Sequence, residues 1–196
     1  MAVLEHVRPR EGIMPRMRSY LVRAGYAATL SKVSPEIMAM AREVYREALE
    51  VAEPLAATLD LAADEMPEEL VPSALHGSKF FSMMLFSLGE KLDRKIDELF
   101  LDGEPLRAVL FDAWGSESVE ALADGVDAEL RKTHGLGTLR FAPGYGGFDI
   151  RRNADWLRTL KKNADFELSV EVDAATGIIA PRKSILCMIG WGHDPT

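Results

Sequence analysis

The stretch EPLRAVLFDAWGSESVEALADGVDAELRKTHG, residues 104–135, constrains the fold more than any other part of the chain. Proline is accepted in the first turn of a helix, where Pro105 stands, and glycine often follows the last turn, as Gly135 does here. The pattern predicts one long helix between them. Gly115 interrupts it, at a cost of about 1 kcal/mol relative to alanine. Such a glycine permits either close packing or the approach of a ligand.

Shorter patterns around this helix define the fold class. Apolar residues at spacings of three and four, with Ser34 as an N-cap and Pro35 in the first turn, predict further helices, and apolar runs or strict alternation predict strands. We expect helices over 34–53, 90–103 and 151–164, strands over 55–61, 78–89 and 166–173, and one or two strands over 178–191. Because these elements do not alternate regularly as β-α-β units, the sequence predicts an α+β fold: a twisted antiparallel sheet with helices packed against it.

The length of the chain, 196 residues, suits a single domain. Residues 1–32 show no clear period, are basic and are broken by prolines. We therefore expect an N-terminal arm over residues 1–32, lying on a domain formed by residues 33–196.

Composition excludes several classes of protein. A net charge of −8 argues against nucleic acid as a partner, because binding the phosphate backbone needs a surplus of Lys and Arg. The single cysteine, Cys187, excludes a disulfide framework and suggests a buried structural thiol. The N-terminus lacks the apolar core of a signal peptide, and no apolar run is long enough to span a membrane. We expect a cytoplasmic protein that neither spans nor binds a membrane.

Common catalytic and binding motifs do not occur. The sequence contains no G-x-G-x-x-G after a strand, no Walker A motif and no G-x-S-x-G elbow. The four histidines lack the spacing of metal ligands, so no metal site is expected. Residue spacing alone therefore proposes no catalytic group.

The stretch LRFAPGYGGFD, residues 139–149, is the strongest candidate for a binding site. Arg140 carries a planar fork that grips a carboxylate through two hydrogen bonds. Gly144 and its neighbouring glycines let a backbone approach a ligand closely, and Tyr145 offers a flat face for a ring or a cation. The stretch fits a loop that binds an amino-acid-like ligand, and it also fits a glycine-rich loop with a structural arginine and a core tyrosine.

The long helix also carries an acidic side. Glu117, Glu120, Asp124 and Asp127 recur at spacings of three and four, so they share one side of the helix. A carboxylate there would suit an ammonium or sulfonium group. A solvated helix face explains the same run.

The sequence RFAPGYGGFD resembles the R-x-x-x-G-Y signature of the activation (reactivation) domain of cobalamin-dependent methionine synthase. The likeness extends over roughly residues 33–192, through the helical centre at 86–127 and the closing strands at 176–191, and it is to short, stand-alone members of that family. The resemblance implies a domain that binds S-adenosylmethionine and helps to return oxidised cobalamin to service by reductive methylation.

The resemblance assigns ligand contacts to individual residues. Arg140 matches the arginine expected to pair with the methionyl carboxylate, and Gly144 and Tyr145 match the Gly-Tyr that shapes and covers the pocket. Backbone atoms of Phe141 and Ala142 would supply polar contacts, and Glu120 matches an acidic helix position that contacts the ligand.

Two departures accompany the resemblance. His134 holds a position six residues before the arginine where the family has an acidic residue, and no early acidic contact has a convincing match. The chain also lacks a D-x-H-x-x-G stretch, so cobalamin would have to be carried by a partner protein.

The expected partner is a corrinoid protein or a truncated methionine synthase, with an electron donor such as flavodoxin or ferredoxin. Two alternatives remain open. One is a non-catalytic docking or sensing module for a corrinoid protein, and the other is an unrelated small-molecule enzyme that reuses the fold.

Overall fold

The computed structural model describes residues 3–5, 10–26 and 30–192. Its centre is an antiparallel sheet of four strands in the order β1-β2-β3-β6. The strands are β1 Leu4–Glu5, β2 Leu55–Ala62, β3 Phe80–Ser87 and β6 Ser184–Trp191. Phe80 pairs with Trp191 and Ser87 with Ser184, so β3 and β6 match along their full length. This sheet and the helices around it confirm the predicted α+β class.

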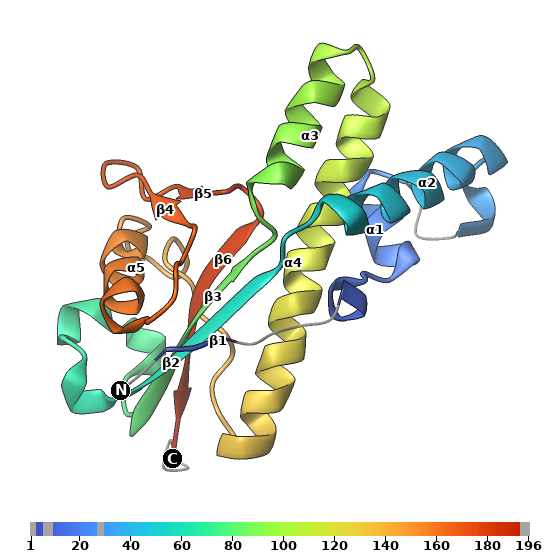
Figure 1. Ribbon diagram of the computed structural model, residues 1–196. Coiled ribbons are helices and arrows are strands. Elements are labelled where there is room, and N and C mark those ends of the chain that lie inside the picture. The colour runs from blue at the N-terminus through green and yellow to red at the C-terminus, as the bar shows by residue number, and fades with distance from the viewer. Residues whose placement is uncertain (1–2, 6–9, 27–29, 193–196) are drawn as a thin grey trace.

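Helices cover both faces of the sheet (Figure 1). One face packs against α1 Met17–Arg23, α2 Pro35–Val51, α3 Glu90–Leu101 and the long α4 Pro105–His134. The other packs against α5 Arg152–Asn163 and the small hairpin of β4 Glu171–Val172 and β5 Ile179–Ala180. Met84 contributes to the first core and Met83 to the second. Since both faces are buried, β3 is apolar along nearly its whole length.

Local signals in the sequence fix the helix ends. The Ser34 hydroxyl accepts a hydrogen bond from Ile37 N at 3.3 Å, as an N-cap should. Gly135 follows α4 with φ of 84°, a conformation that L side chains rarely adopt. The segment 63–77, between β2 and β3, forms three short 3₁₀ turns: Ala63–Glu65, Glu68–Leu70 and Ser73–Leu75.

Gly115 permits close packing in the middle of α4. A Cβ at this position would lie 2.9 Å from the Leu92 side chain and 3.0 Å from Cγ of Lys183. The Lys183 ammonium then reaches Asp112 at 2.7 Å and the Ser116 hydroxyl at 3.0 Å. The missing side chain therefore lets the buried stem of a lysine cross the helix.

The segment 166–173 differs from the sequence-based expectation. The predicted strand 166–173 is paired only at Glu171–Val172, where it meets β5. Val170 N donates instead to Leu168 O at 2.7 Å, a local bond that interrupts regular pairing. Leu168 and Val170 nevertheless bury one face, as the alternation predicts.

The described part of residues 1–32 packs on the domain. It adds β1 to the sheet edge, a 3₁₀ turn at Arg10–Ile13, α1, and a second 3₁₀ turn at Leu30–Lys32. Ile13, Tyr20 and Leu21 are fully buried in the core beside α4. The division between an arm and a domain at residue 32 remains a prediction.

Candidate functional site

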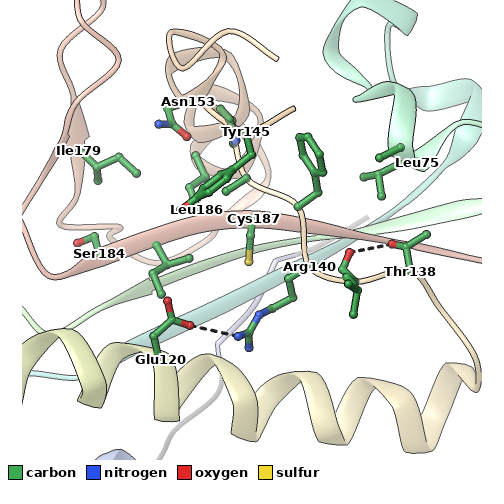
Figure 2. A pocket seen from close by; sticks show the side chains of 16 residues that line it. Leu75, Glu120, Thr138, Arg140, Tyr145, Asn153, Ile179, Ser184, Leu186 and Cys187 are labelled. Atoms are coloured by element: carbon green, nitrogen blue, oxygen red, sulfur yellow. Dashed lines mark hydrogen bonds and ion pairs between the residues drawn. The ribbon is translucent and has the colours of Figure 1, made fainter. Parts of the chain in front are cut away.

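A cleft of about 740 Å³ runs along the outer edge of β6, between α4 and the start of α5 (Figure 2). The edge is partly covered by the segment after α4, which forms bridges from Gly137 to Trp191 and from Phe141 to Met188. From Cys187 back to Ser184, no bridge of this kind forms at the outer edge of β6 among the described residues. The cleft is lined by Ala74, Leu75, Glu120, Thr138, Leu139, Arg140, Phe141, Ala142, Pro143, Tyr145, Asn153, Ile179, Ser184, Ile185, Leu186 and Cys187.

Arg140 reaches the cleft because its segment runs extended beside β6. Phe141 N donates to Met188 O at 2.9 Å, and Met188 N donates to Phe141 O at 2.8 Å. Successive side chains of an extended segment point to opposite sides. Arg140 therefore points toward α4, whereas Phe141 points toward α5 and packs against Phe148 with ring centroids 6.2 Å apart.

The guanidinium of Arg140 meets two carboxylates of α4. Its Nη2 donates to Asp124 Oδ1 at 2.8 Å and to Glu120 Oε2 at 3.2 Å. The arginine side chain is 20% exposed, whereas Glu120 is half exposed. Arg140 Nη1 is buried and has no hydrogen-bond partner among the described residues. A buried guanidinium nitrogen without a partner is costly, so this atom is a candidate donor to an acceptor from outside the chain.

The carboxylates on the acidic side of α4 pair with arginines. Besides Glu120 and Asp124, which share Arg140, Glu117 pairs with Arg23 of α1. Asp127 pairs with Arg131 one turn later, at 2.7 Å. Each of the four carboxylates therefore has an arginine partner, and of the two that share Arg140, Glu120 lines the cleft.

The loop after Arg140 is closed by its own hydrogen bonds. Gly144 N donates to Phe148 O at 2.8 Å, and Phe148 N donates to Tyr145 O at 2.9 Å. Gly144 has φ of 96°, which shapes the turn, and it is not among the residues that line the cleft. Tyr145 is 70% exposed and stands at the cleft. The loop thus presents an aromatic ring on a backbone that glycine allows to turn sharply.

The floor of the cleft is formed by β6. Because Met188 bonds outward to Phe141, the alternation of an antiparallel strand turns the backbone N–H and C=O of Leu186 toward the same outer edge. Cys187, between Leu186 and Met188, has a buried side chain, and burial raises the pKa of its thiol to about 12. Cys187 is therefore a neutral, structural thiol at neutral pH, as the sequence indicates.

The sequence-based candidates are brought together with one exception. Arg140, Phe141, Ala142, Tyr145 and Glu120 all line the cleft, and Gly144 does not. Both backbone polar groups of Phe141 are engaged by Met188, whereas no described residue accepts from the Ala142 N–H. Of these two residues, Ala142 has the amide that remains available to a ligand.

Several lining residues carry no local signal in the sequence. Asn153, Ile179 and Leu75 come from three separate elements and meet at the cleft only in the folded chain. An asparagine at the start of a helix is ordinary, so nothing in its neighbourhood singles out Asn153. The alternating pattern marks Ile179 only as a strand residue.

His134 lies away from the cleft. Its Nε2 is 3.2 Å from Asp60 Oδ2 on β2, and its ring packs against Phe80 and Trp191 with centroids 5.1 Å apart in both cases. The residue therefore joins the end of α4 to the sheet. Its position in the sequence, six residues before Arg140, does not place it among the lining residues.

No group of three or more His, Cys, Asp or Glu side chains is placed to hold a metal ion within the described ranges. None of the helices in those ranges has the length and apolar character that crossing a membrane requires.

The fold and the cleft define an α+β domain with a pocket at a sheet edge, lined in part by Arg140 and Glu120. A solved structure with the same fold is the MetH reactivation domain bound to AdoHcy, which matches with a TM-score of 0.64 and 13% sequence identity. The match covers 100% of this chain and 80% of the other. No family model matches the sequence. A search of curated proteins also found no match. The likeness at this identity establishes the fold.

Proposed function

We propose that the cleft binds S-adenosylmethionine and that the protein supports reductive methylation of cobalamin carried by a separate corrinoid protein. The observation that carries the proposal is Arg140, which lines a cleft of suitable size and whose buried Nη1 has no acceptor among the described residues. A ligand carboxylate is the natural acceptor, because a guanidinium fork matches it in shape and charge. The fold shared with a domain that binds AdoHcy points to the same class of ligand.

The charges of the cleft suit this ligand. Arg140 contributes one positive charge, and Glu120 and Asp124 contribute two negative charges beside it. S-adenosylmethionine carries a carboxylate, an ammonium and a sulfonium, so its net charge is positive. Arg140 would hold the carboxylate, and Glu120 would face the ammonium or the sulfonium. Tyr145 would cover the ligand from the rim, and the Ala142 N–H would add a polar contact.

Bound S-adenosylmethionine would supply a methyl group to the cobalt of the partner's reduced cobalamin, with its sulfur–methyl bond broken and S-adenosylhomocysteine as the leaving group. The chain itself would bind the ligand, orient the methyl group and place carboxylates near the positive sulfur. It would need no general acid or base. The partner would be a corrinoid protein such as a truncated methionine synthase, served by an electron donor such as flavodoxin or ferredoxin, and the reaction would take place in the cytoplasm.

The binding step is tested by isothermal titration of S-adenosylmethionine into the wild type and into Arg140→Ala. We expect the substitution to weaken binding about tenfold to a hundredfold, because it removes charge-assisted hydrogen bonds. Arg94→Ala is the matched control, since Arg94 is an exposed arginine on α3 that pairs only with Glu90. No binding by the wild type, or equal binding by both variants, would contradict the proposal.

Exposed apolar side chains beside the cleft support contact with a partner protein. Leu139 is 85% exposed and Tyr145 is 70% exposed, and both line the cleft. This surface also favours the alternative of a non-catalytic docking or sensing module. The reactivation function and the docking function are distinguished by mixing the protein with a corrinoid partner, a reductant and S-adenosylmethionine. The absorbance of the corrinoid then reports its methylation. Methylation lost in Arg140→Ala supports reactivation, whereas partner capture that ignores the ligand and produces no methylation supports docking.

A further inference from the structure

Asn153 presents a buried acceptor at the end of the cleft opposite Arg140 (Figure 2). The residue lies in the first turn of α5 and is 5% exposed. Its Nδ2 donates to Gly177 O at 3.0 Å. Its Oδ1 is buried and has no partner among the described residues. A buried carboxamide oxygen normally accepts a hydrogen bond, so its isolation beside a cleft points to a ligand.

The orientation of this carboxamide is fixed by its neighbour. A carbonyl oxygen can only accept, so the amide nitrogen must face Gly177 and the oxygen must face away from it. Gly177 itself cannot shift easily. Its φ is 75°, and a Cβ there would lie 2.5 Å from Ile150 O, so the turn after β4 is pressed against the backbone that precedes α5. Asn153 Oδ1 is therefore held in one direction.

The surroundings of Asn153 suit a flat, mainly apolar group. Ile179, Leu75 and Leu186 contribute apolar side chains to the lining, and the Tyr145 ring stands nearby. A ligand whose carboxylate is held by Arg140 would extend its other end toward this part of the cleft. An aromatic base fits such walls when a donor on its edge meets the single acceptor.

We propose that Asn153 Oδ1 accepts a hydrogen bond from the exocyclic amino group of the ligand's purine and so selects adenosyl over inosyl ligands. The inference rests on the proposed function, since it assumes that the cleft holds an adenosyl amino acid. In an inosyl ligand a carbonyl oxygen replaces the amino group. Two acceptors would then face each other, and neither would be satisfied.

The experiment measures dissociation constants of S-adenosylhomocysteine and S-inosylhomocysteine by isothermal titration. We expect the wild type to prefer the adenosyl ligand by about tenfold or more, because a site built to accept a hydrogen bond rejects a ligand without the donor. In Asn153→Ala the preference should fall to about twofold or less. If Asn153 has a purely structural role, Asn153→Ala should weaken the binding of both ligands equally and leave the ratio of their dissociation constants unchanged.

Two variants make the result specific. Asn153→Asp keeps an acceptor but loses the donor to Gly177, so it should retain the preference even where overall affinity drops. This variant also decides the matter should Asn153→Ala fail to fold. Asn163→Ala is the matched control, since Asn163 lies at the other end of α5 and bonds Thr159 O at 2.8 Å. It should behave as the wild type.

Each outcome has a definite meaning. A wild type that binds both ligands equally, or an Asn153→Ala variant that keeps the full preference, overturns the role of Asn153 and leaves the proposed function standing. A preference that is lost in Asn153→Asp as well overturns it too. A wild type that binds neither ligand overturns the proposed function and this inference together.

Discussion

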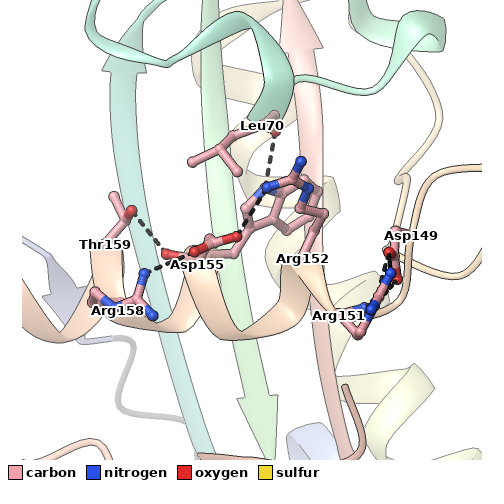
Figure 3. Close-up of polar contacts among 8 residues, drawn as sticks. Leu70, Asp149, Arg151, Arg152, Asp155, Arg158 and Thr159 are labelled. Carbon is pink, nitrogen blue, oxygen red and sulfur yellow. Dashed lines mark hydrogen bonds and ion pairs between the residues drawn. The ribbon is translucent and has the colours of Figure 1, made fainter. Parts of the chain in front are cut away.

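The Asp149 carboxylate, between the cleft loop and α5, is held by a single neighbouring residue. It accepts hydrogen bonds from the Arg151 backbone N at 2.9 Å and from Arg151 Nε at 2.9 Å and 3.1 Å (Figure 3). The side-chain bonds from Arg151, followed by its backbone bond, lower the pKa of Asp149 to about 2, from an ordinary 3.8. The pair lies immediately before α5, whose first turn carries Asn153.

This pair predicts a specific acid sensitivity. Because the pKa of Asp149 is lower in the folded state, its contribution to stability is complete above about pH 4 and is lost as the pH falls toward about 2. NMR titration of the Asp149 carboxyl should give the low pKa directly, and Arg151→Gln should return it toward 3.8. Arg158→Gln is the control, since Arg158 bonds Asp155 on the same helix. A wild-type pKa near the ordinary value would contradict the assignment.

At the residue scale, the sequence predicts the candidates whose chemistry is distinctive and misses those defined by contacts. Arg140 and Tyr145 stand out because a guanidinium that can bind a carboxylate and an aromatic ring that can cover a ligand lie beside several glycines. Asn153 does not, because its isolated oxygen arises from a bond to Gly177, which is distant in the sequence. Without these contacts in the folded chain, the same asparagine would be an ordinary surface residue.

The segment that carries Arg140 is tied to the end of α4 by one arginine. Arg131 donates to Gly137 O at 3.2 Å and to Thr138 O at 2.7 Å, and pairs with Asp127. Its guanidinium also lies 5.7 Å from the centre of the Trp191 ring, which suits a cation–π contact. Helix, cleft segment and edge strand therefore meet at a single side chain.

Replacing Arg131 should destabilise the segment that joins α4 to the cleft. We expect Arg131→Lys to lower the free energy of unfolding by about 1–3 kcal/mol, since an ammonium cannot reproduce the planar fork. Hydrogen exchange should also become faster at the Thr138 and Phe141 amides, which bond to β6. Arg94→Lys, on the exposed side of α3, should change neither measurement. Unchanged exchange at those two amides in Arg131→Lys would show that β6 alone holds the segment.

Elements with a clear helical period were predicted well, and short pieces were not. The pattern predicts α4 correctly, because Pro105 and Gly135 mark its ends and apolar residues recur between them. The 166–173 segment reads as a strand from alternation alone, yet only its last part meets a partner. Pairing depends on where the neighbouring strand lies, and the sequence of one strand does not contain that information. Helix α1 was not predicted because a helix of two turns has too few apolar repeats to show a period.

The N-terminal segment shares the core of the whole molecule. Besides burying Ile13, Tyr20 and Leu21, it supplies the Pro15 carbonyl that accepts from the Tyr45 hydroxyl at 2.8 Å. Tyr45 in turn meets the rings of Tyr20 and Trp114 edge-on, each at 6.0 Å between centroids. These contacts join α1, α2 and α4 into one aromatic cluster.

We therefore expect a chain of residues 33–196 to be less stable than the full chain. Burial of each large apolar side chain is worth about 1.5–3 kcal/mol, so losing three of them should lower the unfolding midpoint markedly. A matched pair of substitutions isolates the packing effect. Leu21→Ala should cost about 2–5 kcal/mol, whereas Val22→Ala, at a neighbouring position that is 43% exposed, should cost far less. Equal stability of the long and short chains would contradict the expectation and favour a separable arm.

The cleft draws its walls from Leu75, Glu120, Arg140, Asn153 and Leu186, which are spread over more than half of the chain. A short fragment of the protein therefore cannot contain all of these walls, and the unfolded chain has no equivalent surface. A compound that occupies the cleft must then shift the folding equilibrium by mass action, by about 2.7 kcal/mol at a hundredfold excess over its Kd. Thermal melting in the presence of many small molecules becomes a direct assay of occupancy, and it needs neither a partner protein nor a known reaction.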